Sequence, residues 1–459
     1  MNLFDHDMVK RIAQVIPTAV SGSVLETVGM TVAVADFPAP VGAAVEIDRQ
    51  GDTPIPAEVV GFRDRATLIF PLSGLAGIRR GNPVRLVRTN RSVAVGDGLL
   101  GRVVDALGRT IDDRPHPLLP HRTPLERKAP RPIDRTRIEQ PLATGVRAID
   151  AMLTCGKGQR MGIFSGSGVG KSVLLGMMAR YTSADVNVIA LVGERGREVN
   201  EFLERDLGPE GRPRSVVVVA TSDEPALMRV RAASTATAIA EYFRDRGKHV
   251  LLLMDSVTRF AMAQREIGLS AGEPPATRGY PPSVFAQLPK LVERAGCSER
   301  GSITAFYSVL VEGDDANEPI ADAVRGLLDG HTWLSREFAS RGHYPAIDIL
   351  KSISRLMVQI APAEQQAAAT LLRELLAAYR DHEDLISVGA YRRGSQPNVD
   401  CAIDLKNEID SLLKQDITQH CSLDEANRAL VALATRARSQ LAAIPRAAAT
   451  GNTATAATA

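Results

Sequence analysis

The segment of this chain best suited to bind phosphate is a glycine-rich octapeptide, Ser165-Gly-Ser-Gly-Val-Gly-Lys-Ser172. It follows an apolar stretch, Arg160–Phe164, and precedes Val173–Arg180, which has the composition of a helix. Glycines let several backbone N–H groups converge on phosphate oxygens at a helix N-terminus. The pattern therefore predicts a cradle for the phosphates of ATP, with a flexible structural loop as the alternative. The expected cradle residues are Gly166, Ser167, Gly168, Val169, Gly170, Lys171, Ser172 and Val173.

Two side chains of this motif have chemistry of their own. Lys171 is expected to reach the β- and γ-phosphates, and the Ser172 hydroxyl is expected to bind Mg²⁺. The first position of the motif is normally glycine and is Ser165 in this chain. That position serves the turn that leaves the strand, whereas the residues that touch the nucleotide are intact.

Carboxylates follow two further apolar runs. Asp255 ends the run that starts at Val250, and Glu194 follows the run that starts at Val188. Ligands of open α/β sheets lie at the carboxyl ends of the strands, so Asp255 is predicted to hold Mg²⁺ and Glu194 to orient the attacking water. Arg195, next to Glu194, can meet phosphate oxygens. The alternatives are a turn-capping aspartate and a solvated charge cluster.

The composition is that of an ordinary globular protein. The 459 residues carry a net charge of +2 and only 4% aromatic residues, so neither nucleic acid nor an anionic membrane is the expected main partner. The four cysteines form no Cys-x-x-Cys pair, which predicts free thiols in a reducing cytosol. The N-terminal residues do not form a secretory signal, and no run approaches the roughly 20 apolar residues of a membrane span. A cytoplasmic location is expected.

Short apolar runs between residues 19 and 92 are separated by Gly, Pro and Asp. Strands at this spacing predict a small β-barrel. Before them, large apolar residues recur every four positions from Phe4 to Ile16, which predicts an amphipathic helix over residues 1–18. That helix either packs on the barrel or docks a partner.

Residues 93–360 are predicted to form an α/β domain. Seven prolines between Arg114 and Pro141 indicate an extended connection without regular structure. β-rich runs then alternate with helical patterns, which predicts a mainly parallel sheet with helices on both faces. Helical spacing over residues 361–445 predicts an α-helical C-terminal domain. Residues 446–459 hold few large apolar groups and are expected to be disordered.

Six segments of the chain together carry a family resemblance. They are Thr144–Asp150, Ser165–Ser172, Gly193–Glu198, Met254–Phe260, Gly272–Phe285 and Gly301–Phe306. They resemble the rotary-type ATPase superfamily and, more narrowly, the type III protein-export ATPases of flagella and injectisomes. The resemblance covers about residues 20–440 and implies a β-barrel, a RecA-like P-loop domain and a helical tail, in that order.

The resemblance implies roles for three more residues. Arg355 matches the arginine finger that reaches into the nucleotide site of the neighbouring subunit. Tyr344 matches the aromatic residue that packs on the adenine, and Arg259 matches a phosphate-side arginine. Without the resemblance, Tyr344 is read as a packing residue and the two arginines as surface charges.

The resemblance also implies an assembly. In ion-translocating rings the catalytic glutamate and the arginine finger come from two kinds of subunit, whereas this chain carries both Glu194 and Arg355. We therefore expect a homohexamer in which each phosphate loop meets Arg355 of the next copy. The implied partners are a stator or regulator protein at the N-terminal region, export substrates with their chaperones, and the membrane export gate, on which the ATPase docks peripherally. No nucleic acid is expected.

The expected function is Mg-ATP hydrolysis that energises type III protein export. Flagellar export is favoured over virulence or symbiosis secretion, because Pro275–Pro282 and Gly170–Arg180 look closer to flagellar members. Two alternatives come from other classes: a catalytic subunit of an ion-translocating ATPase and a hexameric RNA translocase. The balanced charge argues against RNA, and a noncatalytic scaffold is disfavoured because no catalytic lysine or carboxylate is missing.

Overall fold

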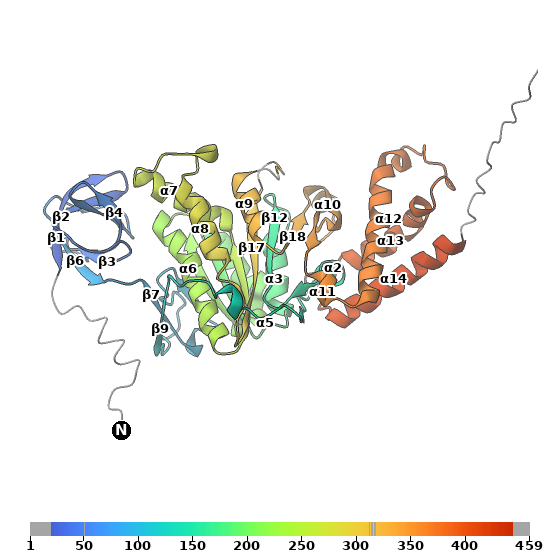
Figure 1. Cartoon of the computed structure of the whole chain (residues 1–459), viewed down its shortest axis with the longest axis horizontal. Helices are drawn as coiled ribbons and strands as arrows, with labels where there is room; N and C mark the ends of the chain where they lie inside the picture. Colours follow the sequence, from blue (N-terminus) through green and yellow to red (C-terminus); the bar gives the residue numbers. More distant parts are fainter. Residues whose placement is uncertain (1–19, 50, 312, 314, 316–317, 444–459) are drawn as a thin grey trace, which may run out of the picture.

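The structure is a computed structural model that describes residues 20–443, apart from residues 50, 312, 314 and 316–317. Figure 1 shows three parts in a row: a barrel, a central sheet covered by helices, and a group of C-terminal helices. This order confirms the fold class predicted from the sequence. The predicted N-terminal helix over residues 1–18 and the predicted tail over residues 446–459 lie outside the described residues.

Six strands form the N-terminal barrel: β1 (Ser21–Val28), β2 (Thr31–Ala35), β3 (Ala44–Ile47), β4 (Ile55–Arg63), β5 (Ala66–Pro71) and β6 (Pro83–Arg88). They close in the order β1-β2-β5-β4-β3-β6, and β1 pairs with β6. Inward and outward side chains alternate along β3, where Val45 and Ile47 are buried. β1 has a single buried residue, Val24, so no apolar run in the sequence reveals this strand.

The central domain is built on a nine-stranded sheet. Its strands are β8 (Val103–Asp105), β12 (Arg160–Ser165), β13 (Val186–Glu194), β14 (Ser215–Thr221), β15 (His249–Asp255), β16 (Gly296–Cys297), β17 (Ser302–Leu310), β18 (Gly330–Leu334) and β19 (Ile353–Ser354). The order is β19-β18-β12-β17-β15-β13-β14-β8, and only β16 and β19 run antiparallel to their neighbours. β12, β13, β15 and β17 therefore end at the same edge, where ligands of such sheets bind.

Helices cover both faces of this sheet, as Figure 1 shows. The described helices of the central domain are α2 (Arg147–Met152), α3 (Lys171–Tyr181), α4 (Gly196–Glu201), α5 (Gly208–Gly211), α6 (Ala226–Asp245), α7 (Val257–Ser270), α8 (Pro282–Val292), α9 (Pro319–Leu327), α10 (Arg336–Ser340) and α11 (Met357–Ile360), with a π-helix at Phe202–Leu207 and 3₁₀ helices at Asp97–Leu99, Pro132–Asp134, Arg212–Arg214, Thr277–Gly279 and Ile349–Lys351. Successive residues of a strand point to opposite faces. Val188 of β13 joins the core that contains α6, and Ile189 joins the core that contains α3. Burial on both faces explains why the strands read as continuous apolar runs.

The proline-rich connection holds short strands, so the prediction that it lacks regular structure was wrong. β9 (His121–Pro124) pairs with β7 (Ser92–Val95), and β10 (Pro141–Leu142) pairs with β11 (Cys155–Gly156). The prolines lie only at the ends of β9 and β10. A proline at a strand end removes little from the hydrogen-bond ladder, which is why these strands form.

The C-terminal part is α-helical, as predicted, and its described helices are α12 (Ala363–Ser387), α13 (Pro397–Leu413) and α14 (Leu423–Ala443). Leu372, Leu405 and Leu430, one from each helix, belong to the same buried core as Ile149 of α2 and Leu175 of α3. The C-terminal helices are therefore tied to the face of the sheet that carries α3.

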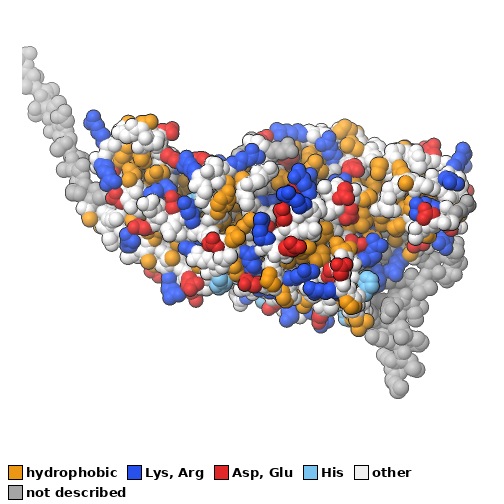
Figure 2. All heavy atoms as spheres, turned by 180° about the vertical axis from the view of Figure 1, so that it is seen from behind, with side chains coloured by type: hydrophobic (Ala, Val, Ile, Leu, Met, Phe, Trp, Pro, Cys, Tyr) orange, Lys and Arg blue, Asp and Glu red, His pale blue; other side chains and the backbone are white. Residues whose placement is uncertain are grey.

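The surface and the cysteines agree with the composition. Basic and acidic side chains are interspersed across the face seen in Figure 2. All four cysteines are free and buried, as predicted. In the part of the chain that the structure describes, none of the helices combines the length and the apolar content that a bilayer span requires.

The edge strand β8 is held by a buried ion pair between Arg102 and Asp112. The hydrogen bond from Arg102 lowers the pKa of Asp112 to about 2, and the N–H of Val103 also donates to this carboxylate at 3.0 Å. Because the folded pKa lies below the ordinary value, the pair stabilises the fold above about pH 4. Asp112→Asn should lower the free energy of unfolding at pH 7 by about 2 kcal/mol.

Urea unfolding across a pH series measures this contribution. The difference between Asp112→Asn and wild type should shrink as the pH falls from about 4 towards about 2, where the wild-type carboxylate takes up its proton. A difference that stays constant over this pH range would contradict the assignment.

Candidate functional site

β12 delivers the glycine-rich loop to the N-terminus of α3, as the sequence predicts. Gly168 has φ +78° and Gly170 has φ +88°, so both adopt the left-handed conformation that favours glycine. A Cβ on Gly168 would meet nothing within 4 Å, so the backbone there is open to a ligand. The cradle residues 166–173 lie in this loop and the first turn of α3, where N–H groups and the helix dipole attract phosphate.

Lys171 lies between two carboxylates at the same edge of the sheet. Its Nζ forms an ion pair with Oδ1 of Asp255 and lies 3.7 Å from Oε1 of Glu194. Asp255 ends β15 and Glu194 ends β13, and the two strands are parallel neighbours. Ser308 of β17 donates a 2.6 Å hydrogen bond to the same Asp255 oxygen. The structure therefore brings together the lysine and both carboxylates that the strand-end pattern selected.

Burial and the neighbouring charges set the protonation of this cluster. Burial raises the pKa of Glu194 to about 7, with the Asp255 charge adding to the shift and the Lys171 charge opposing it. Burial disfavours the charged form of Lys171, but the Asp255 and Glu194 carboxylates outweigh it and raise the pKa of Lys171. Lys171 therefore stays cationic at neutral pH, and Glu194 can exchange a proton there, as a group that polarises water requires.

The two predicted phosphate-side arginines differ in position. Arg259, in the first turn of α7, packs against Gly193, where an added Cβ would lie 3.0 Å from Arg259 Cβ. Its Nε is buried without a hydrogen-bond partner, and its positive charge opposes the rise in the pKa of Lys171. The Arg195 side chain is instead 80% exposed and pairs with Glu198 at 3.5 Å. The structure brings Arg259 into the cluster and leaves Arg195 on the surface.

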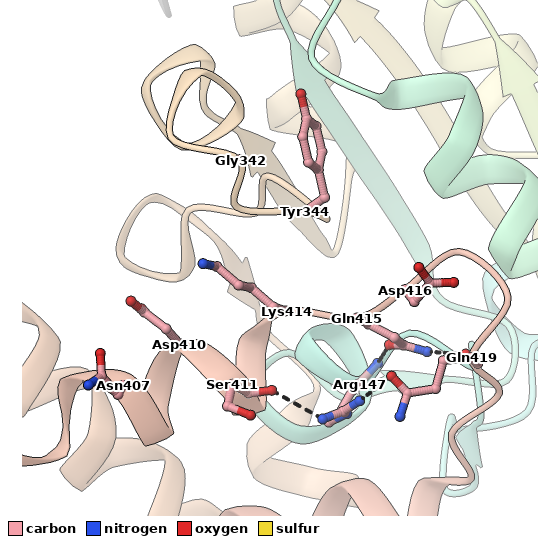
Figure 3. Close-up of a pocket in the computed structure, with 10 residues that line it drawn as sticks. All are labelled: Arg147, Gly342, Tyr344, Asn407, Asp410, Ser411, Lys414, Gln415, Asp416 and Gln419. Atoms are coloured by element: carbon pink, nitrogen blue, oxygen red, sulfur yellow. Dashed lines mark hydrogen bonds between the residues drawn. The ribbon is translucent and has the colours of Figure 1, made fainter.

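Tyr344 lies beside the phosphate loop and lines a hollow between the central and C-terminal parts. A Cβ on Gly170 would lie 3.5 Å from its ring, and 43% of Tyr344 is exposed. The hollow has a volume of about 630 Å³. Figure 3 shows Tyr344 across this hollow from α13 and the segment that follows it. Arg147 of α2 donates hydrogen bonds to Ser411 and Gln419 on that opposite side. An exposed ring beside a hollow suits a flat nucleobase.

Arg355 lies at the edge of the sheet, directly after β19. β18 separates β19 from β12, and Arg355 is level with Arg160, at the start of β12. The phosphate loop follows the other end of β12, roughly 16 Å further along the strand, which is more than an arginine side chain spans. The Arg355 side chain is exposed, and its guanidinium makes no hydrogen bond or ion pair within the described residues. It cannot serve the phosphate loop of its own chain.

Two residues of this region were not predicted. The Arg336 guanidinium, at the start of α10, lies against Gly166, where an added Cβ would collide with it. Arg336 follows β18, which pairs in parallel with β12, so it lies at the same edge as Asp255 and Glu194, but only the structure identifies β18 as a strand of this sheet. For Ser308, the only sequence signal is a polar residue inside a buried apolar strand.

The residues present fit a magnesium nucleotide. Buried polar atoms without a hydrogen-bond partner are rare, yet Glu194 Oε1 and Arg259 Nε are two such atoms beside Lys171. Among the described residues, no group of three or more His, Cys, Asp or Glu forms a metal site of its own. Mg²⁺ that is bound to phosphates needs only one or two protein ligands, which Ser172 and Asp255 can supply.

A parallel sheet with a glycine-rich loop, the lysine of that loop and two strand-end carboxylates defines a P-loop nucleoside triphosphatase. Two family models match the chain. The nucleotide-binding domain of the ATP synthase alpha/beta family matches residues 145–354, and the C-terminal domain of the type III secretion ATPase EscN matches residues 361–432.

Relatives of two kinds are similar along most of their length. The flagellum-specific ATP synthase of Bacillus subtilis is 56% identical, over 83% of this chain and 86% of the relative. The type 3 secretion system ATPase of Xanthomonas euvesicatoria is 53% identical, over 87% of this chain and 90% of the relative.

Solved structures agree with these relatives. The structure of the assembled ATPase EscN from the type III secretion system of enteropathogenic E. coli has a TM-score of 0.86 at 45% identity, over 90% of this chain and 100% of that chain. EscN in complex with its central stalk EscO has a TM-score of 0.84 at 44% identity, with the same coverage. The chain belongs to the ATP synthase alpha/beta family, in its group of flagellum-specific and type 3 secretion system ATPases.

Proposed function

We propose that this chain hydrolyses Mg-ATP at the interfaces of a ring of six identical copies and so energises protein export through a type III apparatus, which we assign to the flagellum. One observation carries the interface mechanism. The chain holds a complete phosphate cradle with two carboxylates, and it also holds an exposed arginine, Arg355, that cannot reach this cradle. Identical neighbours in a closed ring would bring the two together.

The proposed mechanism assigns one role to each residue. Lys171 binds the β- and γ-phosphates, and Ser172 with Asp255 would hold magnesium, which neutralises phosphate charge when bound. Glu194 accepts a hydrogen bond from the attacking water and orients it. Arg355 of the neighbouring copy stabilises the negative charge that develops on the transferred phosphoryl group.

Two further contacts of the nucleotide complete the proposal. Tyr344 packs on the adenine, because its ring is exposed between the phosphate loop and the hollow of Figure 3. Arg259 contributes positive charge on the phosphate side from the first turn of α7. Arg195 needs a rotation away from Glu198 before it can contribute, because the structure holds it on the surface.

The assembly and the partners follow from the relatives. EscN has been solved as an assembled ATPase and in complex with a central stalk, which supports the ring and a stalk protein as partner of this chain. We also propose a stator or regulator at the N-terminal region, export substrates with their chaperones, and peripheral docking on the membrane export gate. An injectisome is the second candidate apparatus, because the C-terminal family model is that of EscN.

Mixing two inactive variants tests the proposed interface. Lys171→Ala loses the cradle and Arg355→Ala loses the finger, so each alone should hydrolyse ATP near background. In rings mixed 1:1, about a quarter of the interfaces pair an intact Lys171 with an intact Arg355, so up to about a quarter of the wild-type rate should return. ATP turnover and native mass spectrometry of the rings measure this.

The matched control replaces Lys171→Ala in the mixture with the Lys171→Ala/Arg355→Ala double variant. No interface of that mixture is complete, so turnover should stay at background. If the two single variants form mixed rings but hydrolyse ATP no faster than they do apart, Arg355 does not act between copies.

A further inference from the structure

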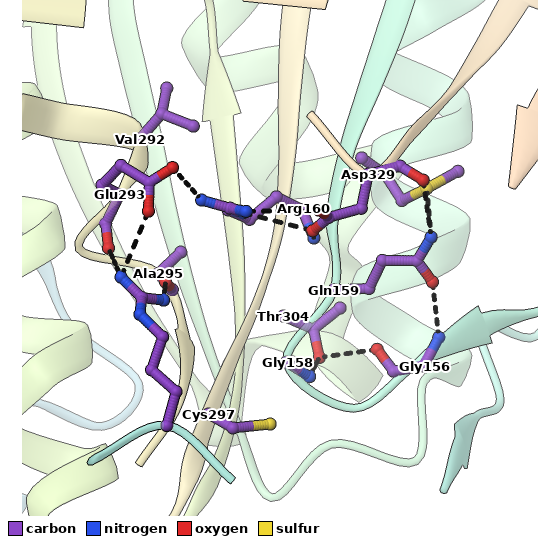
Figure 4. Close-up of polar contacts among 12 residues, drawn as sticks. Gly156, Gly158, Gln159, Arg160, Val292, Glu293, Ala295, Cys297, Thr304 and Asp329 are labelled. Carbon is purple, nitrogen blue, oxygen red and sulfur yellow. Dashed lines mark hydrogen bonds and ion pairs between the residues drawn. The ribbon is translucent and has the colours of Figure 1, made fainter. Parts of the chain in front are cut away.

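Gln159, the residue before β12, is completely buried at the end of the sheet opposite to the phosphate loop. Its Oε1 accepts the N–H of Gly156 at 2.8 Å. Its Nε2 donates to Oγ of Ser354 at 3.1 Å and to the carbonyl oxygen of Asp329 at 3.3 Å. Figure 4 shows the amide between Gly156 and Asp329. One side chain thus ties the turn before β12 to the segment before β18 and to the end of β19.

The two groups that accept hydrogen bonds from Gln159, the Asp329 carbonyl and the Ser354 hydroxyl, both lie next to Arg355. The carbonyl oxygen of Asp329 also accepts the backbone N–H of Arg355 at 3.0 Å, and Ser354 immediately precedes Arg355. The Ser354 hydroxyl is fixed on its other side as well, because it donates to the carbonyl oxygen of Thr154 at 2.9 Å. Buried groups therefore hold the backbone of Arg355, although its guanidinium is exposed.

A row of alternating charges holds Asp329 in place. Its carboxylate accepts the backbone N–H of Arg160 at 3.0 Å and two guanidinium N–H groups of Arg160 at 3.2 Å. Arg160 also pairs with Glu293 (Figure 4). Glu293 in turn accepts a hydrogen bond from Arg135 at 3.2 Å. The three contacts with Arg160 fix the segment before β18 against the start of β12, so the Asp329 carbonyl keeps its place beside Arg355.

We propose that Gln159 is a positioning residue for Arg355. The inference rests on the finger role proposed above. It explains how the backbone that carries the long, flexible Arg355 side chain is held in place for contact with a neighbouring copy. A misplacement of about 1 Å at a reacting centre can cost about 10²-fold in rate, so the backbone from which Arg355 extends must be fixed. Gln159 itself cannot touch the nucleotide of its own chain, because the length of β12 separates it from the phosphate loop.

Gln159→Leu tests this proposal, since leucine removes the donor and the acceptor at similar size. We expect kcat for ATP to fall about 10- to 100-fold, while KM and the affinity for a fluorescent ATP analogue stay within about twofold of wild type. In an Arg355→Ala background the same substitution should change kcat by less than about twofold, because no guanidinium remains to be positioned. A purely structural role would lower kcat equally in both backgrounds.

Two further variants make the outcome decisive. Glu293→Gln weakens only the far end of the charged row, because the three hydrogen bonds between Arg160 and Asp329 and the contacts of Gln159 do not involve Glu293. Its kcat should therefore stay within about twofold of wild type. Ser354→Ala removes one acceptor with less disturbance of the core and should reproduce the selective loss of kcat even if Gln159→Leu fails to fold. Unchanged kcat in Ser354→Ala, or equal losses with and without Arg355, would overturn the positioning role. Normal turnover of Arg355→Ala alone would instead overturn the finger itself.

Discussion

Arg355→Ala should lower kcat for ATP about 10³-fold or more, which corresponds to about 4 kcal/mol of transition-state stabilisation. The loss is this large because the guanidinium meets charge that develops only during phosphoryl transfer. Nucleotide affinity should stay within about twofold, since Arg355 lies far from the phosphate loop of its own chain. Steady-state turnover and equilibrium binding of a fluorescent ATP analogue separate these two effects.

Lys351→Ala is the matched control for this experiment. Lys351 is another exposed cation of the same edge segment, four residues before Arg355, and its removal should leave turnover within about twofold. Turnover of Arg355→Ala at the wild-type rate under ring-forming conditions would rule out the interface mechanism.

Glu194→Gln should trap ATP on the enzyme. Glutamine has the size of glutamate but lacks the negative charge that orients and polarises the attacking water, so kcat should fall about 10²-fold or more. The cradle and Lys171 remain, so binding should persist. After a single round of mixing with labelled ATP, the bound nucleotide should be mostly ATP, whereas wild type should hold mostly ADP.

Glu198→Gln is the control for the loss of a nearby negative charge. Glu198 contributes to the raised pKa of Glu194 but pairs with Arg195 on the surface. Its amide variant should keep near-normal turnover and should not accumulate ATP. Equal behaviour of the two variants would assign the effect to local charge rather than to water activation.

The phosphate loop and the two carboxylates beside it could be predicted because a parallel sheet places the residues that follow its strands at one edge. Every strand of such a sheet ends at the same edge, so a polar residue after an apolar run is placed there whatever the sequence distance. Asp255 is 84 positions from Lys171, yet the two form an ion pair. The strands themselves were readable because both of their faces are buried.

Local spacing is a weaker guide where the chain turns. Arg195 was predicted at the phosphates because it follows Glu194, but β13 ends there and Arg195 caps α4, which directs it outward. Arg336 was missed because β18, with His, Thr and Trp, does not read as an apolar run. The proposed roles of Tyr344 and Arg355 came from the family resemblance, since the groups that they would face lie on distant segments or, in the proposed ring, on another copy.

The order of the sheet places the cradle on β12 and Arg355 beyond β18, so in the proposed ring every copy belongs to two neighbouring sites at once. A chain that lacks both Lys171 and Arg355 would therefore silence the site on each of its sides. Produced together with the normal protein, such a chain would be a dominant-negative inhibitor of the ring. The steepness with which ATPase activity falls as the fraction of this variant rises would show how many copies of the ring act cooperatively.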